Sequence, residues 1–234
     1  MSKGKLYLIP APLGSSPLEE ILPAGVMAAA CRLECFVVEE VRTARRFLSA
    51  YGLKGRIDTL EFHTLNEHTR PEEVEALLPL FDRGDVGYIS EAGLPAVADP
   101  GAALVALCHR EGIEVVPLVG PSSLMLALMA SGLNGQSFAF CGYVPAKADE
   151  RKTALKALEK HSKAENQSKI IIETPYRNDA LFADMLKVFA PETRICIAAD
   201  ITLPTQFIKT QSVARWRKNT PEIGKRPCVF VVLA

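Results

Sequence analysis

The sequence predicts an α/β protein of two domains, with a mainly parallel sheet in the N-terminal domain and a mixed sheet in the C-terminal domain. In the first half of the chain, short apolar and β-branched runs alternate with longer helical patterns. This alternation is typical of βαβ units and of a parallel sheet covered on both faces. From Arg194 onward, strand patterns follow one another without comparable helices, which favours a mixed sheet. We expect the domains to cover residues 1–117 and 118–234.

The N-terminal domain shows strand and helix patterns in strict alternation. The expected strands are short apolar runs, at 5–10, 35–39, 59–63, 86–90 and 113–118. The expected helices lie between them, at 18–30, 44–51, 72–81 and 102–110. Gly52 and Gly112 end two of these helices, because glycine readily adopts the positive φ of a helix C-cap.

The C-terminal domain opens with a helix at 124–130, directly after the segment Gly120-Pro121-Ser122-Ser123. Proline is tolerated at a helix start because the N–H that it lacks would be unpaired there. Ser122 or Ser123 either caps this helix or binds a ligand. Further strands are expected at 138–141, 169–173, 194–199, 206–213 and 228–233, and further helices at 148–161 and 178–189.

Composition excludes several classes of protein. Lys and Arg together number 27, as do Asp and Glu, so wholesale electrostatic capture of nucleic acid is not indicated, although a local basic patch remains open. No apolar run reaches the ~18 residues that suggest a membrane span, and no signal-peptide pattern follows Met1. The six cysteines include no Cys-x-x-Cys pair. We therefore expect reduced thiols, a cytoplasmic location, no membrane partner and no metal site.

Loops rich in glycine and proline follow several predicted strands. They lie at 10–14, 90–101 and 119–123, and a fourth at 173–177 follows a strand of the C-terminal domain. Open α/β sheets bind ligands at the carboxyl ends of their strands, which is where these loops begin. Backbone N–H and C=O groups in such loops suit a ligand with a carboxylate, an amine and a nucleoside. The chain has neither a P-loop nor a Gly-x-Gly-x-x-Gly motif.

The order and spacing of these motifs resemble the tetrapyrrole methylase superfamily, the class III S-adenosylmethionine-dependent methyltransferases. Within it, the chain is most similar to the branch that methylates the ribose 2′-hydroxyl of a cytidine in small-subunit ribosomal RNA. The resemblance implies methyl transfer from S-adenosylmethionine bound in a cleft between two domains, an RNA acceptor and a homodimer. The motifs that carry it lie at 6–14, 39–43, 90–95, 99–101, 117–123, 142–145 and 173–177.

The resemblance also implies site residues. Those expected at the cofactor are Pro12, Leu13, Gly14, Ser90, Glu91, Ala92, Gly93, Pro121, Ser122, Ser123 and Tyr176. Arg42 is expected to face the acceptor, although a solvated helical face would equally account for it. Methylation of a hydroxyl requires removal of its proton, so Glu39 or Glu40 is a candidate base, unless both only pair with nearby arginines.

The chain departs from the family pattern on the expected acceptor side. Threonines of the family pattern are replaced by Ala11, Val41 and Leu94, and aspartates by Glu40 and Glu91. Two alternatives to RNA methylation therefore stay open. One is a methyltransferase for a tetrapyrrole or a protein side chain, and the other is a cofactor-binding protein without catalytic activity.

Overall fold

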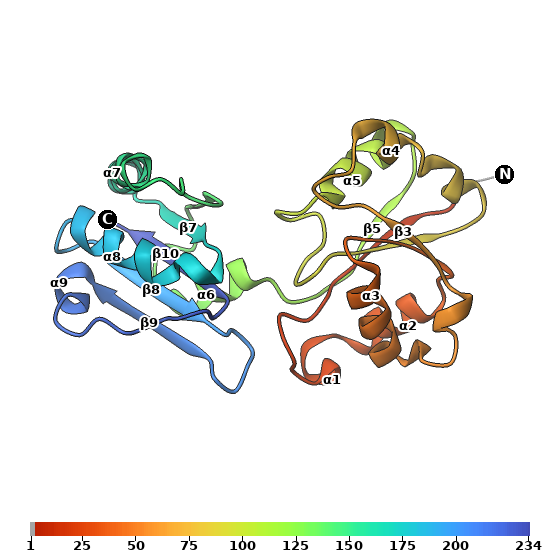
Figure 1. The fold of residues 1–234 in the computed structure, drawn as a ribbon, viewed down its shortest axis with the longest axis horizontal. Helices are drawn as coiled ribbons and strands as arrows, with labels where there is room; N and C mark the ends of the chain where they lie inside the picture. Colours follow the sequence, from red (N-terminus) through yellow and green to blue (C-terminus); the bar gives the residue numbers. More distant parts are fainter. Residues whose placement is uncertain (1–2) are drawn as a thin grey trace. The chain divides into compact units, whose positions relative to one another are not determined.

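The computed structural model describes residues 3–234, which form two compact units that divide after Ser122 (Figure 1). The segment that follows strand β5 still belongs to the first unit. The Leu118 amide donates a hydrogen bond to the Leu8 carbonyl, at 3.1 Å. Gly120 packs directly on Pro10, since a Cβ at Gly120 would lie 2.2 Å from the Pro10 Cβ. The first unit thus extends slightly past residue 117.

Within residues 3–122, the sheet has the strand order β3-β2-β4-β1-β5, and every neighbouring pair is parallel. This confirms the predicted parallel sheet. Its strands are β1 Leu6–Ile9, β2 Cys35–Val38, β3 Glu61–Thr64, β4 Val86–Ile89 and β5 Val115–Pro117.

Helices cover both faces of this sheet, as the alternation along β2 shows. Phe36 and Val38 belong to the apolar cluster formed with α2 and α3, whereas Val37 belongs to the cluster formed with α4 and α5. In Figure 1 these two pairs of helices lie on opposite sides of the strands. The helical segments are α1 Leu18–Ile21, α2 Ala24–Cys31, α3 Val41–Leu48, η1 Ser49–Leu53, η2 Ile57–Thr59, α4 Pro71–Glu75, η3 Leu78–Asp82 and α5 Gly101–Arg110.

Two predicted helices are interrupted at prolines, so both predictions were wrong as single helices. The helix expected at 18–30 is split into α1 and α2. Leu22 adopts an extended conformation, with φ −116° and ψ 133°, because the following Pro23 disfavours the helical region. The helix expected at 72–81 becomes α4 followed by the 3₁₀ helix η3, which has Pro79 in its first turn.

The second unit contains a mixed sheet, as predicted, with the order β6-β7-β10-β8-β9 within residues 123–234. Strands β6 and β7 are parallel and the other neighbours are antiparallel. The strands are β6 Phe138–Phe140, β7 Ser168–Ile172, β8 Arg194–Ala199, β9 Phe207–Ser212 and β10 Cys228–Leu233. The helical segments are α6 Ser123–Ser131, α7 Ala148–Glu165, η4 Pro175–Arg177, α8 Asn178–Val188 and α9 Val213–Trp216.

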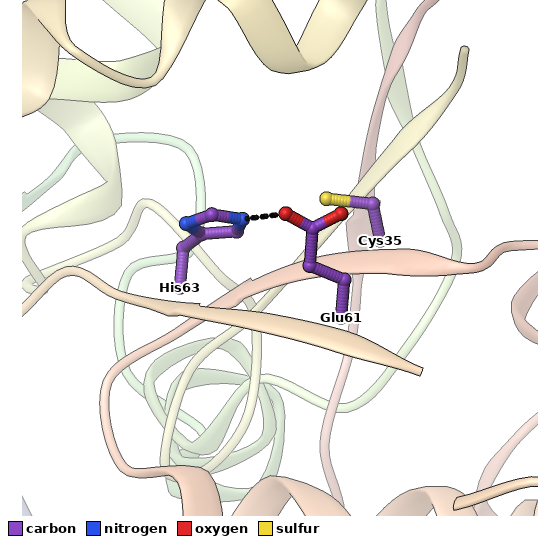
Figure 2. A group of neighbouring side chains, drawn as sticks. All are labelled: Cys35, Glu61 and His63. Carbon is purple, nitrogen blue, oxygen red and sulfur yellow. Dashed lines mark hydrogen bonds and ion pairs between the residues drawn. The ribbon is translucent and has the colours of Figure 1, made fainter. Parts of the chain in front are cut away.

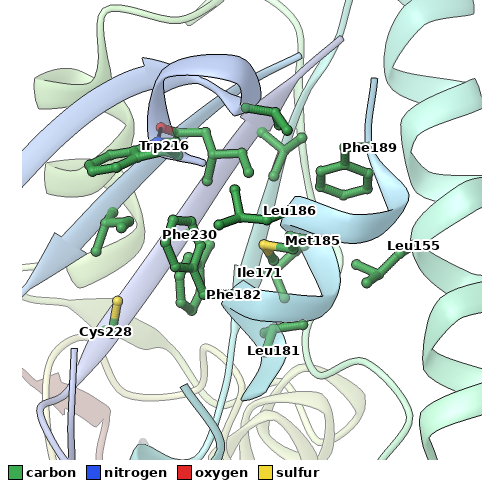
Figure 3. Close-up of a cluster of buried hydrophobic side chains, with 14 of the residues drawn as sticks. Leu155, Ile171, Leu181, Phe182, Met185, Leu186, Phe189, Trp216, Cys228 and Phe230 are labelled. Carbon is green, nitrogen blue, oxygen red and sulfur yellow. Dashed lines mark hydrogen bonds between the residues drawn. The ribbon is translucent and has the colours of Figure 1, made fainter. Parts of the chain in front are cut away.

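The core of the second unit forms where α7 and α8 pack on the mixed sheet (Figure 3). Phe182 stacks on Phe230 and meets Trp216 edge-on, with ring centroids 6.2 and 5.6 Å apart. The Trp216 indole N–H donates to the Ile195 carbonyl, at 2.9 Å, so this buried polar group is satisfied. Among residues 3–234, no helix combines the length and the apolar character that crossing a membrane would require.

Candidate functional site

The sheet order of the first unit brings two of the predicted ligand loops, and the motif at 39–43, to one edge of the sheet. Strands β2, β4 and β1 are neighbours and parallel, so their carboxyl ends lie together. The segments that leave these ends begin at Glu39, Ser90 and Pro10, respectively. This edge is the usual ligand-binding position in open α/β sheets.

Backbone hydrogen bonds join two of these loops. The Ala11 amide donates to the Gly93 carbonyl at 2.9 Å, and the Gly93 amide donates to the Ala11 carbonyl at 3.0 Å. Gly93 has φ +73°, which an L side chain rarely adopts. A Cβ there would lie 3.2 Å from Leu13 and 3.5 Å from the Pro121 carbonyl oxygen. The loops that carry Leu13, Gly93 and Pro121 therefore converge.

Glu39 connects the end of β2 to the loop after β4. Its Oε2 atom accepts a hydrogen bond from the Glu91 amide, at 2.7 Å. Burial raises the pKa of the Glu39 carboxyl above its ordinary value, although the Glu91 amide opposes the rise. The nearby negative charges of Asp99, Glu91 and Glu67 add to the rise. Glu39 is thus a half-buried carboxyl with a raised proton affinity.

Glu40 has a different role, because it caps helix α3. Its two carboxylate oxygens accept hydrogen bonds from the amides of Arg42 and Thr43, at 2.9 and 2.6 Å. These bonds lower the pKa of the Glu40 carboxyl. The cap also explains why α3 begins at Val41 rather than at the predicted residue 44.

Asp99 fixes the shape of the loop after β4. Its Oδ2 accepts from the Ala96 amide and its Oδ1 from the Gly101 amide, both at 2.8 Å. The buried Tyr88 hydroxyl donates to Oδ1, at 3.1 Å. Ala96 and Ala98 both have positive φ, at 63° and 60°, which is uncommon for residues with a Cβ. The loop is therefore held in a strained conformation by a single carboxylate.

A hollow of about 570 Å³ opens within the first unit beside these loops. Helix α3 and its continuation η1 contribute Thr43, Arg46, Phe47 and Ala50 to its walls. The predicted cofactor residues among its lining are Pro12, Leu13, Gly14, Glu91 and Ala92. Predicted residues that are separate in the chain thus line one hollow.

The residues around the hollow change the pKa of the Glu91 carboxyl. Partial burial raises the pKa of its carboxyl, and repulsion from Glu40 adds to the rise. A hydrogen bond from Thr43 and the positive charge of Arg46 oppose it. Thr43 and Arg46 are therefore part of the candidate site, although neither was among the predicted site residues. Their spacing of three residues within a helix that follows a strand was the available signal.

The three arginines of α3 differ in their contacts. Arg45 is paired with Asp58, and its guanidinium lies 5.7 Å from the centre of the Phe62 ring. Arg46 lines the hollow. Arg42 is exposed, and no side chain within residues 3–234 forms a hydrogen bond or ion pair with its guanidinium. An unpaired, exposed guanidinium at this edge is suited to bind an external anion.

Two of the predicted residues lie in the second unit. Ser123 is the first residue of α6, and Tyr176 lies in η4 after strand β7. Tyr176 is 79% exposed, and the Lys225 ammonium lies 5.3 Å from the centre of its ring. The loop at 173–177 is fixed by Arg177, which pairs with the buried Glu173 carboxylate at 2.6 Å.

The positions where the family pattern has threonine differ in burial. Ala11 is fully buried, and Val41 packs against the cluster formed with α2 and α3. Val41 and Leu94 are both half-buried and keep part of their surface accessible. The expectation that all of these side chains face the acceptor is therefore wrong for Ala11.

Several known proteins with similar sequences share one name. The chain is 36% identical over 199 residues to "Ribosomal RNA small subunit methyltransferase I" of Neisseria meningitidis serogroup B, covering 85% of this chain and 64% of that protein. It is 30% identical over 235 residues to the protein of the same name from Escherichia coli O157:H7, covering 99% of this chain and 78% of the relative. The chain thus spans less than two thirds of the Neisseria relative's length.

The fold also matches a solved structure. The methyltransferase CobJ superposes with a TM-score of 0.64 at 18% sequence identity, covering 98% of this chain and 94% of CobJ. At this identity the match concerns the fold. The family described as Tetrapyrrole (Corrin/Porphyrin) Methylases matches residues 5–215. With this match over most of its length, the chain belongs to the tetrapyrrole methylase family.

Proposed function

We propose that this protein is an S-adenosylmethionine-dependent methyltransferase that acts on a ribose 2′-hydroxyl of small-subunit ribosomal RNA. Family membership supports methyl transfer, and the names of the similar proteins favour ribosomal RNA over a tetrapyrrole acceptor. An acceptor of this kind implies action in the cytoplasm, where ribosomes are assembled.

One observation carries the proposal, namely the convergence of small-residue loops on a hollow at the carboxyl edge of the parallel sheet. A volume of about 570 Å³ lies within the usual range of ligand pockets. The walls near the loops are formed by Gly14 and Ala92, which leave backbone groups accessible. Such a site fits a nucleoside with an amino acid tail better than it fits a polyphosphate.

In the first unit, the residues expected to hold the cofactor are Pro12 to Gly14, Ser90 to Gly93, Pro121 and Ser122. For Ser123 and Tyr176 of the second unit, a place at the cofactor stays an expectation from the family resemblance. The cofactor, when bound, supplies an electrophilic methyl group on a sulfonium. The protein contributes orientation and exclusion of water, which are effective means of accelerating a direct displacement. The Ala11–Gly93 hydrogen bonds and the Asp99 contacts keep the loops in place before the cofactor binds.

Glu39 is the better candidate for removing the proton of the acceptor hydroxyl. Both oxygens of Glu40 are occupied by the helix cap, which favours its charged, weakly basic form. Glu39 uses only Oε2 for the Glu91 amide, and its pKa is raised. A raised pKa brings a carboxylate closer to the range of an effective base. Arg42 would bind a phosphate of the RNA with its unpaired guanidinium.

A homodimer remains part of the proposal. The second unit has large apolar side chains exposed on α6 and β6, including Met129 at 77% and Phe138 at 40%. Phe140 is exposed two residues further along β6, on the same side of the strand. Phe138 and Phe140 thus form an exposed apolar pair, and exposed apolar patches commonly mark protein interfaces.

The first prediction concerns cofactor binding and the acceptor together. The purified protein should bind S-adenosylmethionine in calorimetry and transfer a labelled methyl group to a ribose of unmodified small ribosomal subunits. Ala92→Phe should abolish both, because the ring would fill the hollow lined by Ala92. Ala157→Phe, on the exposed face of α7, is the matched control and should leave both unchanged. Undiminished affinity in a folded Ala92→Phe protein would refute this position for the cofactor.

The second prediction concerns Arg42. Arg42→Ala should lower methyl transfer to RNA by roughly tenfold or more, which corresponds to the loss of about 1.4 kcal/mol of binding to the acceptor in the transition state. Melting temperature and cofactor affinity should stay the same, since no side chain within residues 3–234 forms a hydrogen bond or ion pair with this guanidinium. Arg32→Ala, at another exposed arginine, serves as the control. A lowered melting temperature with normal turnover would instead assign Arg42 a structural role.

The third prediction concerns Glu39 and pH. A carboxyl whose pKa is raised in the folded state stabilises the protein below its unfolded pKa and loses that contribution as pH rises through the folded pKa. Glu39→Gln should remove this loss, because an amide stays neutral and its oxygen still accepts the Glu91 N–H. Near neutral pH the melting temperature of the variant should therefore be no lower than that of the parent protein. Near pH 4.5 the difference between the two melting temperatures should be smaller.

Turnover should nevertheless fall steeply in Glu39→Gln, because the amide cannot take up a proton. Glu40→Gln provides the comparison. It should lower the melting temperature through the weakened cap of α3 and leave the pH dependence of turnover unchanged. Full turnover of the Glu39→Gln protein would exclude Glu39 as the base.

A further inference from the structure

A second cluster of reactive side chains lies on β3 and β2, at the β3 edge of the parallel sheet. Strand β3 is one of the two edge strands and pairs with β2, with Cys35 directly opposite Glu61. His63 follows two residues after Glu61, so both side chains point to the same face. Figure 2 shows the Cys35 sulfur and the His63 ring on either side of the Glu61 carboxylate.

The possible ligand atoms of these three residues are close together. The Cys35 Sγ, a Glu61 carboxylate oxygen and a His63 ring nitrogen all lie within 4.8 Å of one another. The His63 Nε2 and the Glu61 Oε1 are 2.7 Å apart. All three residues are half-buried, and a hollow of about 380 Å³ beside Cys35 and Glu61 leaves a path for an ion.

The combination of a thiolate, an imidazole and a carboxylate is a typical ligand set for zinc. Three protein ligands leave the fourth tetrahedral position to a water molecule. We propose that Cys35, Glu61 and His63 bind Zn²⁺ and thereby fasten the edge strand β3 to β2. This departs from our sequence-based expectation of no metal site, because the ligands are brought together only by the parallel register of the two strands.

The surrounding charges indicate how strong such binding is. Burial and the nearby Glu61 carboxylate raise the pKa of the Cys35 thiol to about 11, so Zn²⁺ must displace its proton. Arg83 also pairs with Glu61, at 2.8 Å between Nη2 and Oε1, and therefore competes with a cation for the same oxygen. We expect a moderate-affinity site that strengthens when Arg83 is removed.

The test uses the full chain, stripped of metal with a chelator, at mildly alkaline pH. Titration with Co²⁺ should produce a thiolate-to-cobalt charge-transfer band, and Zn²⁺ should abolish that band and raise the melting temperature. Both responses should be lost in Cys35→Ser, and the affinity should fall roughly tenfold or more in His63→Ala. Cys141→Ser and His68→Ala are the controls, since both residues are exposed outside the cluster, and they should bind as the parent protein does.

A third variant tests the assignment of Glu61 independently of the thiol. Arg83→Gln should bind Co²⁺ more tightly than the parent protein, because the carboxylate no longer has a competing partner. The proposal would be overturned by a parent protein without the charge-transfer band, by a Zn²⁺ response that persists in Cys35→Ser, or by unchanged affinity in Arg83→Gln. None of these variants alters the loops assigned to the cofactor. The experiments therefore test the proposed metal site independently of the proposed methyl transfer.

Discussion

The parallel alignment of β1, β2 and β4 is the constraint on which the candidate site depends. It brings Ala11, Glu39 and Gly93 to one edge of the sheet, although they are far apart in the chain. The paired hydrogen bonds between Ala11 and Gly93 then fix the distance between two loops, and the positive φ of Gly93 permits that approach. A shift of one residue in the pairing of β1 with β4 would turn every side chain of β1 to the opposite face and separate these loops.

Carboxylates at this edge have separate roles because their surroundings differ. The carboxylate oxygens of Glu40 and Asp99 accept hydrogen bonds from backbone amides. Glu40 thereby fixes the start of helix α3, and Asp99 fixes the loop after β4. Glu39 has one such bond and is half-buried, which raises its pKa. Different environments for neighbouring carboxyl groups commonly separate structural residues from proton-transfer residues. The same reasoning favours Glu39 as the group that reacts.

The sequence predicted most strands well, because most of them are short apolar runs bounded by glycine, proline or charged residues. Strands β3 and β9 are less apolar, and β3 begins two residues later than predicted. The predictions for two helices were wrong at Pro23 and Pro79, where local backbone restrictions outweigh the apolar periodicity. Loop positions of the site were predictable from their glycines and prolines. Thr43 and Arg46 were not, because their inclusion depends on where α3 begins, and that is set by the Glu40 cap. The cluster of Cys35, Glu61 and His63 depends on pairing between strands, which composition does not reveal.

The central claim is that the loops at the carboxyl edge of the parallel sheet bind S-adenosylmethionine. Hydrogen–deuterium exchange of the full chain, with and without a saturating amount of the cofactor, tests it most directly because it reports amide by amide. The account predicts slower exchange for the amides of residues 13–14 and 91–93, and little change at Cys35 and Glu61. Saturable binding that leaves exchange at 13–14 and 91–93 unaltered would contradict it.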